Sequence, residues 1–143
     1  MTRGSDSQAV RDANLAFYSA FESLDVERME AVWVRSARAQ CTHPGWRRLV
    51  GFSAVMESWR RIFENTFGMK FDITGVEISV SGDIAWVVCT ENITSQTYDG
   101  VSQSQVEATN VFERHDGRWL VVHHHGSPVV SGPVSEEPPP HLQ

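Results

Sequence analysis

Six residues in the first third of the chain combine groups that a small-molecule site needs. Cys41-Thr42-His43-Pro44-Gly45-Trp46 brings together a titratable ring, an X-Pro bond, a glycine and an indole. The proline disfavours helical backbone at His43, and Gly45 allows a sharp turn. Because an imidazole exchanges protons near neutral pH, we expect His43 to act at a pocket mouth as a general acid or base. The alternative is a solvated histidine in a tight turn.

A hairpin near the other end of the chain supplies the second set of polar groups. Asp116-Gly117 marks the turn, and a loop of two or four residues pairs Arg114 with Trp119. Directly opposed residues share a face of a sheet. We therefore predict one face that carries both polar and aromatic side chains: Asn110, Phe112, His123 and His125. A three-residue loop is the alternative, and it would slip this register by one residue and bring in His124.

The run His123-His124-His125 raises the question of a metal ion. Alternate residues of a strand point to the same side, so at most two of the three could bind one ion, with His43 as a possible third ligand. No cysteine or carboxylate stands at a spacing typical of zinc sites. We expect no metal and no other cofactor, and interpret these histidines as hydrogen-bonding groups in a polar-lined cavity. Metal binding remains the alternative.

Other side chains would complete the pocket. Asn110 and Tyr18 are expected to hold a carbonyl or a developing oxyanion. The remaining predicted pocket residues are aromatic walls and one hydroxyl: Trp33, Trp46, Trp59, Trp86, Thr90 and Phe112.

Composition limits the classes of partner. The 143 residues carry a formal net charge of −6, which argues against nucleic acid or an anionic membrane as a main partner. No apolar run approaches the length of a membrane span, and the polar residues 1–8 lack the apolar core of an export signal. With only Cys41 and Cys89 present, a disulfide framework is not expected. We predict a cytoplasmic protein.

Periodicity predicts three helices and then a run of strands. Apolar residues recur at helical spacing over 5–24, 25–34 and 51–66, with Asp25 as a cap and Gly68 as a stop signal. A short strand is expected over 37–42. Alternating strands are expected over 71–80, with Gly75 as a bulge, and over 84–95, 103–114 and 118–126. Four arginines around the third helix (Arg47, Arg48, Arg60 and Arg61) are interpreted as solvated, and attraction of an anionic ligand is the alternative.

This order of elements is typical of an α+β domain with helices gathered on one face of a mostly antiparallel sheet. We predict a single domain over 5–130 and a disordered proline-rich tail over 131–143.

The chain resembles the NTF2-like superfamily, and within it the SnoaL-like group. The resemblance rests on Phe17-Tyr18, on the stretch around His43, on Ala108 to Arg114, and on Asp116 to Trp119 followed by the histidine run. It implies a cone-shaped curved sheet wrapped around three N-terminal helices, a pocket at the wide end and a homodimer. His43 stands where ketosteroid isomerase, a relative, keeps its base, and Asn110 stands near the place of that enzyme's second acid. The association domain of calcium/calmodulin-dependent protein kinase is also similar.

Two functions follow from these patterns. The first is an isomerase, dehydratase or related lyase-type enzyme that binds a small hydrophobic or polar-aromatic ligand and uses His43. Because neither acid of ketosteroid isomerase is matched, steroid isomerisation itself is not expected. The second is a non-catalytic homodimerisation or ligand-sensing module, whose sheet would bury Val87, Cys89, Val111 and Val122 against a second chain.

Overall fold

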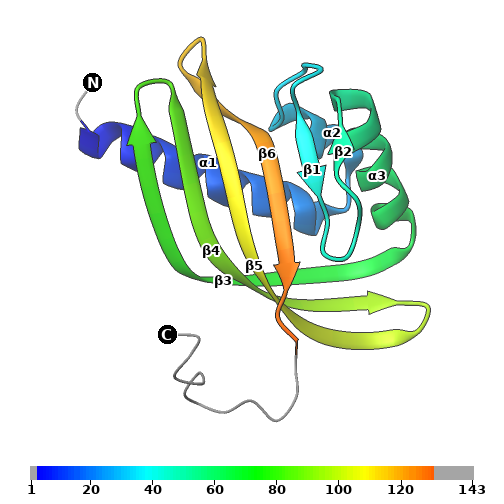
Figure 1. Ribbon diagram of the computed structural model, residues 1–143. Coiled ribbons are helices and arrows are strands. Elements are labelled where there is room, and N and C mark those ends of the chain that lie inside the picture. The colour runs from blue at the N-terminus through cyan, green and yellow to red at the C-terminus, as the bar shows by residue number, and fades with distance from the viewer. Residues whose placement is uncertain (1–2, 131–143) are drawn as a thin grey trace, which may run out of the picture.

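Three helices pack on one side of the sheet (Figure 1). The computed structural model describes residues 3–130. The helices are α1 (Arg3–Ser23), α2 (Val26–Ala31) and α3 (Phe52–Glu64), and Asp25 caps α2 by accepting a hydrogen bond from the Glu27 backbone N–H. The predicted stop at Gly68 is wrong. The chain has already entered the sheet at Thr66, which pairs with Thr97.

Six strands form one curved sheet that does not close into a barrel. They are β1 (Gln40–Thr42), β2 (Leu49–Val50), β3 (Thr66–Ser81), β4 (Ile84–Thr97), β5 (Gly100–His115) and β6 (Arg118–Pro128). Their order across the sheet is β2-β1-β6-β5-β4-β3, and every pair is antiparallel except β1 with β6. The predicted α+β class with a cone-like, mostly antiparallel sheet is confirmed. The sequence did not reveal β2, because two residues are too short to show a period.

Two bulges shape the sheet and decide which side chains point inward. The predicted bulge at Gly75 is confirmed by a register shift between Thr74 and Glu77, and Gly75 adopts a φ of +62° that favours glycine. The second bulge lies between β5 and β6 and was not predicted. There Phe112 pairs with Val121 but Val111 pairs with His123, which leaves one extra residue on β6.

This second bulge makes the predicted register wrong beyond Phe112. Asn110 lies opposite His124, not His123, and Thr109 lies opposite His125. Because the side-chain period of a strand is two residues, a shift of one exchanges the faces. His124 therefore joins Asn110 inside the protein, and His123 and His125 lie on the outer face.

Strand β4 corrects further expectations. Its inward side chains are Ala85, Val87, Cys89 and Glu91, all buried. Trp86, which is 42% exposed, and Thr90 alternate with them and face outward, so neither lines the interior as predicted. Val87 and Cys89 belong to the core and are not available to a second chain.

Aromatic rings fill the space between helices and sheet. Phe17 and Phe21 of α1 meet Trp59 of α3 at ring-centre distances of 5.9 and 4.6 Å, and Phe21 meets Phe71 of β3 at 4.5 Å. Burying one such ring contributes about 1.5–3 kcal/mol, so this cluster holds α1 against both α3 and the sheet.

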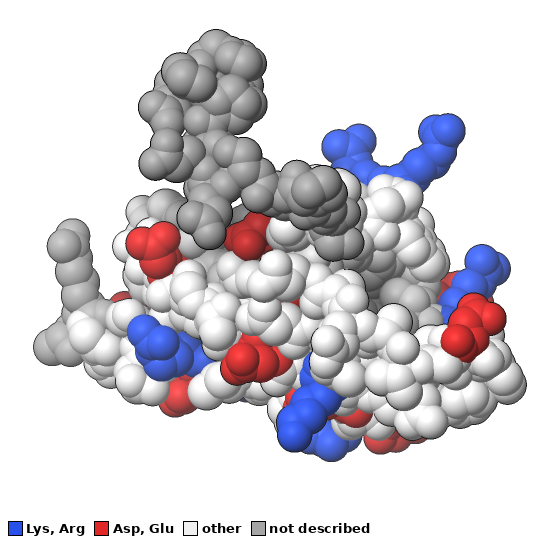
Figure 2. Space-filling view, turned by 90° about the horizontal axis from the view of Figure 1, so that it is seen from below, with Lys and Arg blue, Asp and Glu red and all other residues white. Residues whose placement is uncertain are grey.

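The described surface shows mixed charge. On the face drawn in Figure 2, acidic and basic side chains are interspersed among uncharged residues and form no broad patch of one sign. None of the described helices is long and apolar enough to cross a membrane. The proposed tail over 131–143 lies outside the described residues.

Gly126 allows β6 to pass close to its neighbours. A Cβ atom at this position would lie 2.9 Å from Cγ1 of Val106 and 3.0 Å from Cγ of Pro44, whereas one at Gly4 in α1 would meet nothing within 4 Å. We expect Gly126→Ala to lower the free energy of unfolding by about 1–3 kcal/mol, because overpacking forces neighbours apart. Gly4→Ala should leave it unchanged or slightly higher. Chemical denaturation of both variants measures this, and equal stabilities would contradict the close approach.

Candidate functional site

A continuous chain of polar side chains crosses the apolar interior. It joins Glu91 of β4, Tyr18 of α1, Asn110 of β5 and His124 of β6, with Asn14 of α1 beside it. All five are buried, and Glu91 is only 2% exposed. Because buried polar groups are stabilised only when they are hydrogen-bonded, the positions of these four elements are tied together at this point.

The direction of each hydrogen bond follows from the amide of Asn110. Its Nδ2 donates to Asn14 Oδ1 at 2.9 Å and to Tyr18 Oη at 3.1 Å, and the Tyr18 hydroxyl donates to Glu91 Oε2 at 2.6 Å. The Asn110 oxygen must then accept, so His124 donates to it from Nδ1 at 2.5 Å. A neutral His124 consequently keeps its lone pair on Nε2.

Burial sets the protonation states. It raises the pKa of Glu91 to about 7, against a smaller opposing effect of the Tyr18 hydrogen bond. It raises the pKa of Tyr18 far above its ordinary value, and lowers the pKa of His124 to about 3. At neutral pH the tyrosine and the histidine are therefore uncharged, and Glu91 is divided between its acid and carboxylate forms.

His43 lies in a second polar cluster beside this chain. Ser58 Oγ donates its single proton to the Val55 carbonyl at 2.6 Å, so the 2.8 Å contact between His43 Nε2 and Ser58 Oγ has the histidine as donor. Its Nδ1 lies 3.8 Å from Cys41 Sγ. His43 is 3% exposed, which contradicts a solvated histidine, and burial lowers its pKa to about 4.

Aromatic rings connect the two clusters. The His43 ring lies edge-on to Trp46 and Trp59 at centre distances of 4.9 and 4.6 Å, and its centre is 6.5 Å from that of His124. Trp59 Nε1 is buried and has no hydrogen-bond partner among the described residues. An unpartnered buried donor is unfavourable, so this N–H is available to an acceptor on a bound molecule.

The predicted site residues thus separate into three groups. Tyr18, His43, Trp59, Asn110 and Phe112 lie in the interior, and Trp46 lies at the surface above His43, 42% exposed. Trp86, Thr90, His123 and His125 lie on the outer face of the sheet.

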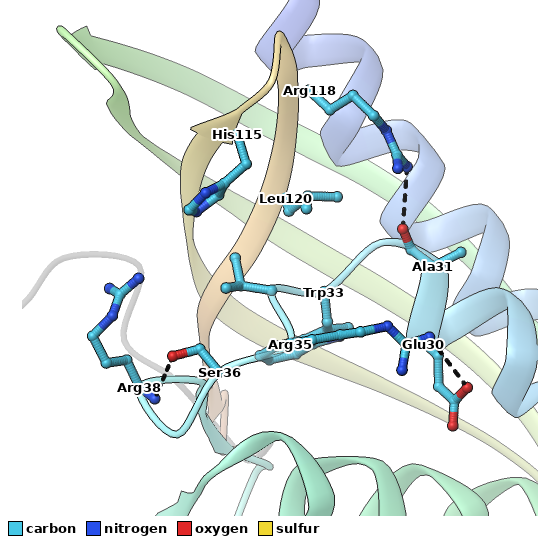
Figure 3. Close-up of a pocket in the computed structure, with 10 residues that line it drawn as sticks. Glu30, Ala31, Trp33, Arg35, Ser36, Arg38, His115, Arg118 and Leu120 are labelled. Carbon is cyan, nitrogen blue, oxygen red and sulfur yellow. Dashed lines mark hydrogen bonds and ion pairs between the residues drawn. The ribbon is translucent and has the colours of Figure 1, made fainter.

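Trp33 is buried away from the polar chain. Its Nε1 donates to Met29 Sδ, and its ring lies under a surface hollow of about 540 Å³ that arginines surround (Figure 3). The cationic groups there already have partners. Arg38 pairs with Glu113, Arg35 with Glu30, and Arg118 donates to the Ala31 carbonyl. This hollow is therefore a poor candidate for an anion site.

Sequence reasoning missed the acid of the site and its nearest neighbours. Glu91, Asn14 and Ser58 were not predicted to take part, and His124 was expected there only in the alternative register. Glu91 continues the buried phase of Ala85, Val87 and Cys89, and a carboxylate in such a phase is a signal that the sequence contains. In the described part of the chain, no three histidine, cysteine or acidic side chains cluster as metal ligands.

The raised pKa of Glu91 has a consequence for stability. A carboxyl group whose pKa is higher in the folded protein stabilises the fold below its unfolded pKa, and this contribution is lost as pH rises through the folded value. Glu91→Gln keeps the shape without the ionisation. As pH rises from 4.5 to about 7, we expect the free energy of unfolding of the wild type to fall relative to that of the variant, by on the order of 3 kcal/mol.

The difference in free energy of unfolding between the variant and the wild type isolates the contribution of Glu91, since His43 and His124 titrate in both proteins. Urea unfolding at a series of pH values measures it, and Glu107→Gln, on the outer face of β5, is the matched control. A constant difference between Glu91→Gln and the wild type across the window would contradict the raised pKa.

Comparison with known proteins places this arrangement in a family. Residues 10–131 match the model of the SnoaL-like domain. The chain is similar to a candidate dehydratase of the NTF2-like family from Streptomyces avermitilis, with 39% identity, a TM-score of 0.86 and coverage of 91% of this chain and 100% of the other. It is also similar to a candidate calcium/calmodulin-dependent protein kinase type II association domain from Thiobacillus denitrificans, with 32% identity, a TM-score of 0.73 and coverage of 82% and 93%.

A curated plant relative extends the comparison. The F-box protein SKIP8 of Arabidopsis thaliana is 31% identical over 121 residues, which are 85% of this chain and 50% of that protein. The chain thus spans about half the length of this relative. The match over residues 10–131, together with the three helices and the unclosed curved sheet, shows that the chain belongs to the SnoaL-like family of NTF2-like proteins.

Proposed function

We propose that this protein binds a small uncharged organic molecule between α1, α3 and the inner face of the sheet, and that it catalyses a dehydration or an isomerisation there. The observation that carries the proposal is the buried carboxyl group of Glu91, whose pKa of about 7 matches the pH at which it would exchange a proton.

Glu91 and the donors near it have roles in such a reaction. Glu91 takes the proton from the carbon next to a substrate carbonyl, and the enol oxygen that develops needs a hydrogen-bond donor. The Trp59 N–H is a donor with no partner among the described residues. Tyr18 gives its proton to Glu91, and Asn110 gives both amide protons to Asn14 and Tyr18. Tyr18 therefore becomes a donor to the enol oxygen only once Glu91 is protonated, and Asn110 acts by holding Tyr18 in place. In a dehydration Glu91 then returns this proton to the hydroxyl group on the next carbon, the C–O bond breaks as the C=C bond forms, and water leaves.

His43 was expected to be the acid or base, and that role is retained as a proposal to be compared with Glu91. The geometry favours Glu91, because His43 Nε2 already donates to Ser58 and a pKa of about 4 makes the ring a weak base. If Glu91 is the base, His43 lines the ligand site and packs against Trp59 to hold it in place.

A ligand would reach the interior beside Trp46. A surface hollow of about 410 Å³ lies there between the indole and the end of α3, lined among others by Ile62, Asn65 and Thr97. The indole lies edge-on to the His43 ring at a centre distance of 4.9 Å, and in this proposal its movement opens the path to the ring. The similarity to a candidate dehydratase, which covers the whole of that chain, supports dehydration as the proposed reaction.

A matched pair of variants tests the proposal. The probe is a panel of aromatic β-hydroxy ketones, and absorbance of the enone product measures turnover. We expect Glu91→Gln to lower kcat by at least about a hundredfold, as expected for loss of a general base, and Tyr18→Phe to lower it less. Glu107→Gln, which removes a carboxylate from the outer face, should have no effect. Loss of turnover in His43→Ala with retention in Glu91→Gln would transfer the role of base to the histidine.

A second candidate function rests on the outer face of the sheet. Ile84 and Trp86 are 39% and 42% exposed there, and Val88, Val111 and Leu120 lie half-buried around them. Exposed apolar residues that adjoin one another mark association surfaces. We infer that two copies of the chain pair through this patch, whether or not the interior is catalytic.

Light scattering measures the association. We expect the wild type to have twice the 16.1 kDa mass of one chain, and Trp86→Glu to have the mass of one chain because it places a charge in the apolar patch. Tyr98→Glu, at an exposed position outside the patch, should remain paired. A wild type that stays monomeric at high concentration would exclude this interface.

A further inference from the structure

Two imidazole rings stand side by side on the outer face of β6. His123 and His125 are two residues apart in an extended strand, so their side chains project from the same face. Their ring centres are 6.2 Å apart, and the ring planes differ by 36°. The bulge at Val111 and Phe112 produces this arrangement, because it directs His124 inward and leaves its two neighbours outside.

We propose that His123 and His125 together chelate one divalent transition-metal ion of the class that prefers imidazole, such as Zn²⁺, Ni²⁺ or Cu²⁺. The site lies on the opposite face of the sheet from Glu91 and is independent of the proposed reaction. It departs from the expectation that the chain holds no metal, and the ion would lie on the surface of the domain.

The distance between the rings is compatible with one shared ion. With a metal–nitrogen bond of about 2.1 Å, each ring centre lies about 3.2 Å from the ion, so two ligating rings are at most about 6.4 Å apart. The observed separation falls within this limit. Rotation about the side-chain torsions to about 5.3 Å would give a tetrahedral angle at the metal without a change in the backbone.

Both rings have lone pairs to offer. Neither imidazole forms a hydrogen bond with any other described residue. Arg48 opposes a cation here, and the carboxylate of Glu107 on the neighbouring strand offsets that charge.

The surroundings provide oxygen atoms and space. The rings border a shallow hollow of about 560 Å³ that Glu107, Thr109 and Ser127 also line. Glu107 accepts a hydrogen bond from Thr90 at 2.8 Å, which fixes one of its oxygens. Since no third histidine, cysteine or acid of the described chain completes a cluster, water would occupy the remaining positions on the ion. Such an open site suits an exchangeable ion better than a structural one.

The test uses the full chain without an affinity tag, titrated with NiCl₂ by calorimetry and with CuCl₂ by electron paramagnetic resonance. We expect one ion per chain and a Cu²⁺ spectrum with hyperfine splitting from two nitrogens. His123→Ala and His125→Ala should each weaken Ni²⁺ binding by at least about tenfold, because each removes a ligand. His115→Ala, at an exposed histidine on the β5–β6 turn, should bind as the wild type does.

Three results would overturn the site. They are a Cu²⁺ spectrum with splitting from one nitrogen, Ni²⁺ binding retained in the variant lacking both histidines, or half an ion per chain. Thermal unfolding in the presence of a chelator shows whether each variant is folded, and a variant with the wild-type Tm that still binds Ni²⁺ counts against the proposal.

Discussion

The hydrogen bond between the Tyr18 hydroxyl and the Glu91 carboxyl group is the interaction on which the interior depends. It gives the buried Glu91 carboxyl group a hydrogen-bond partner, and it fixes the tyrosine so that Asn110 can donate to the tyrosine oxygen. Asn110 in turn accepts from His124. Loss of any one member leaves a buried polar group without a partner, at a cost of about 1–3 kcal/mol. The helix α1 and three neighbouring strands are therefore held in register by this chain as well as by apolar packing.

The same interaction links fold and chemistry. Desolvation disfavours the charged form of Glu91, and the Tyr18 hydrogen bond favours it, and the balance lies near neutral pH. His43 and His124 experience the same apolar surroundings, but burial moves their pKa values in the opposite direction. One interior thus produces a carboxyl group that exchanges protons and two histidines that stay neutral. That division is what an acid–base reaction on an uncharged substrate requires.

The architecture could be predicted from the sequence more completely than the site could. Periodicity located the helices and the four long strands, because each buries a clear apolar face, and the Asp116-Gly117 turn located the last hairpin. The sequence could not decide between the two registers that place His124 outside or inside, since the extra residue on β6 leaves no local signal. Trp86 and Thr90 were misplaced because both strand faces carry apolar residues and the period alone does not say which face is inside. The inward direction of Glu91 could have been predicted, because its position in the strand alternation matches that of Val87 and Cys89.

The central claim is that Glu91 exchanges its proton near neutral pH inside the folded protein. Carbon NMR of the side-chain carboxyl groups, with the Glu91 signal assigned by its loss in Glu91→Gln, measures this directly. We expect a titration midpoint of about 7 for this carbon. A midpoint near the ordinary glutamate value of about 4.3 would contradict it, because Glu91 would then be a plain carboxylate at neutral pH.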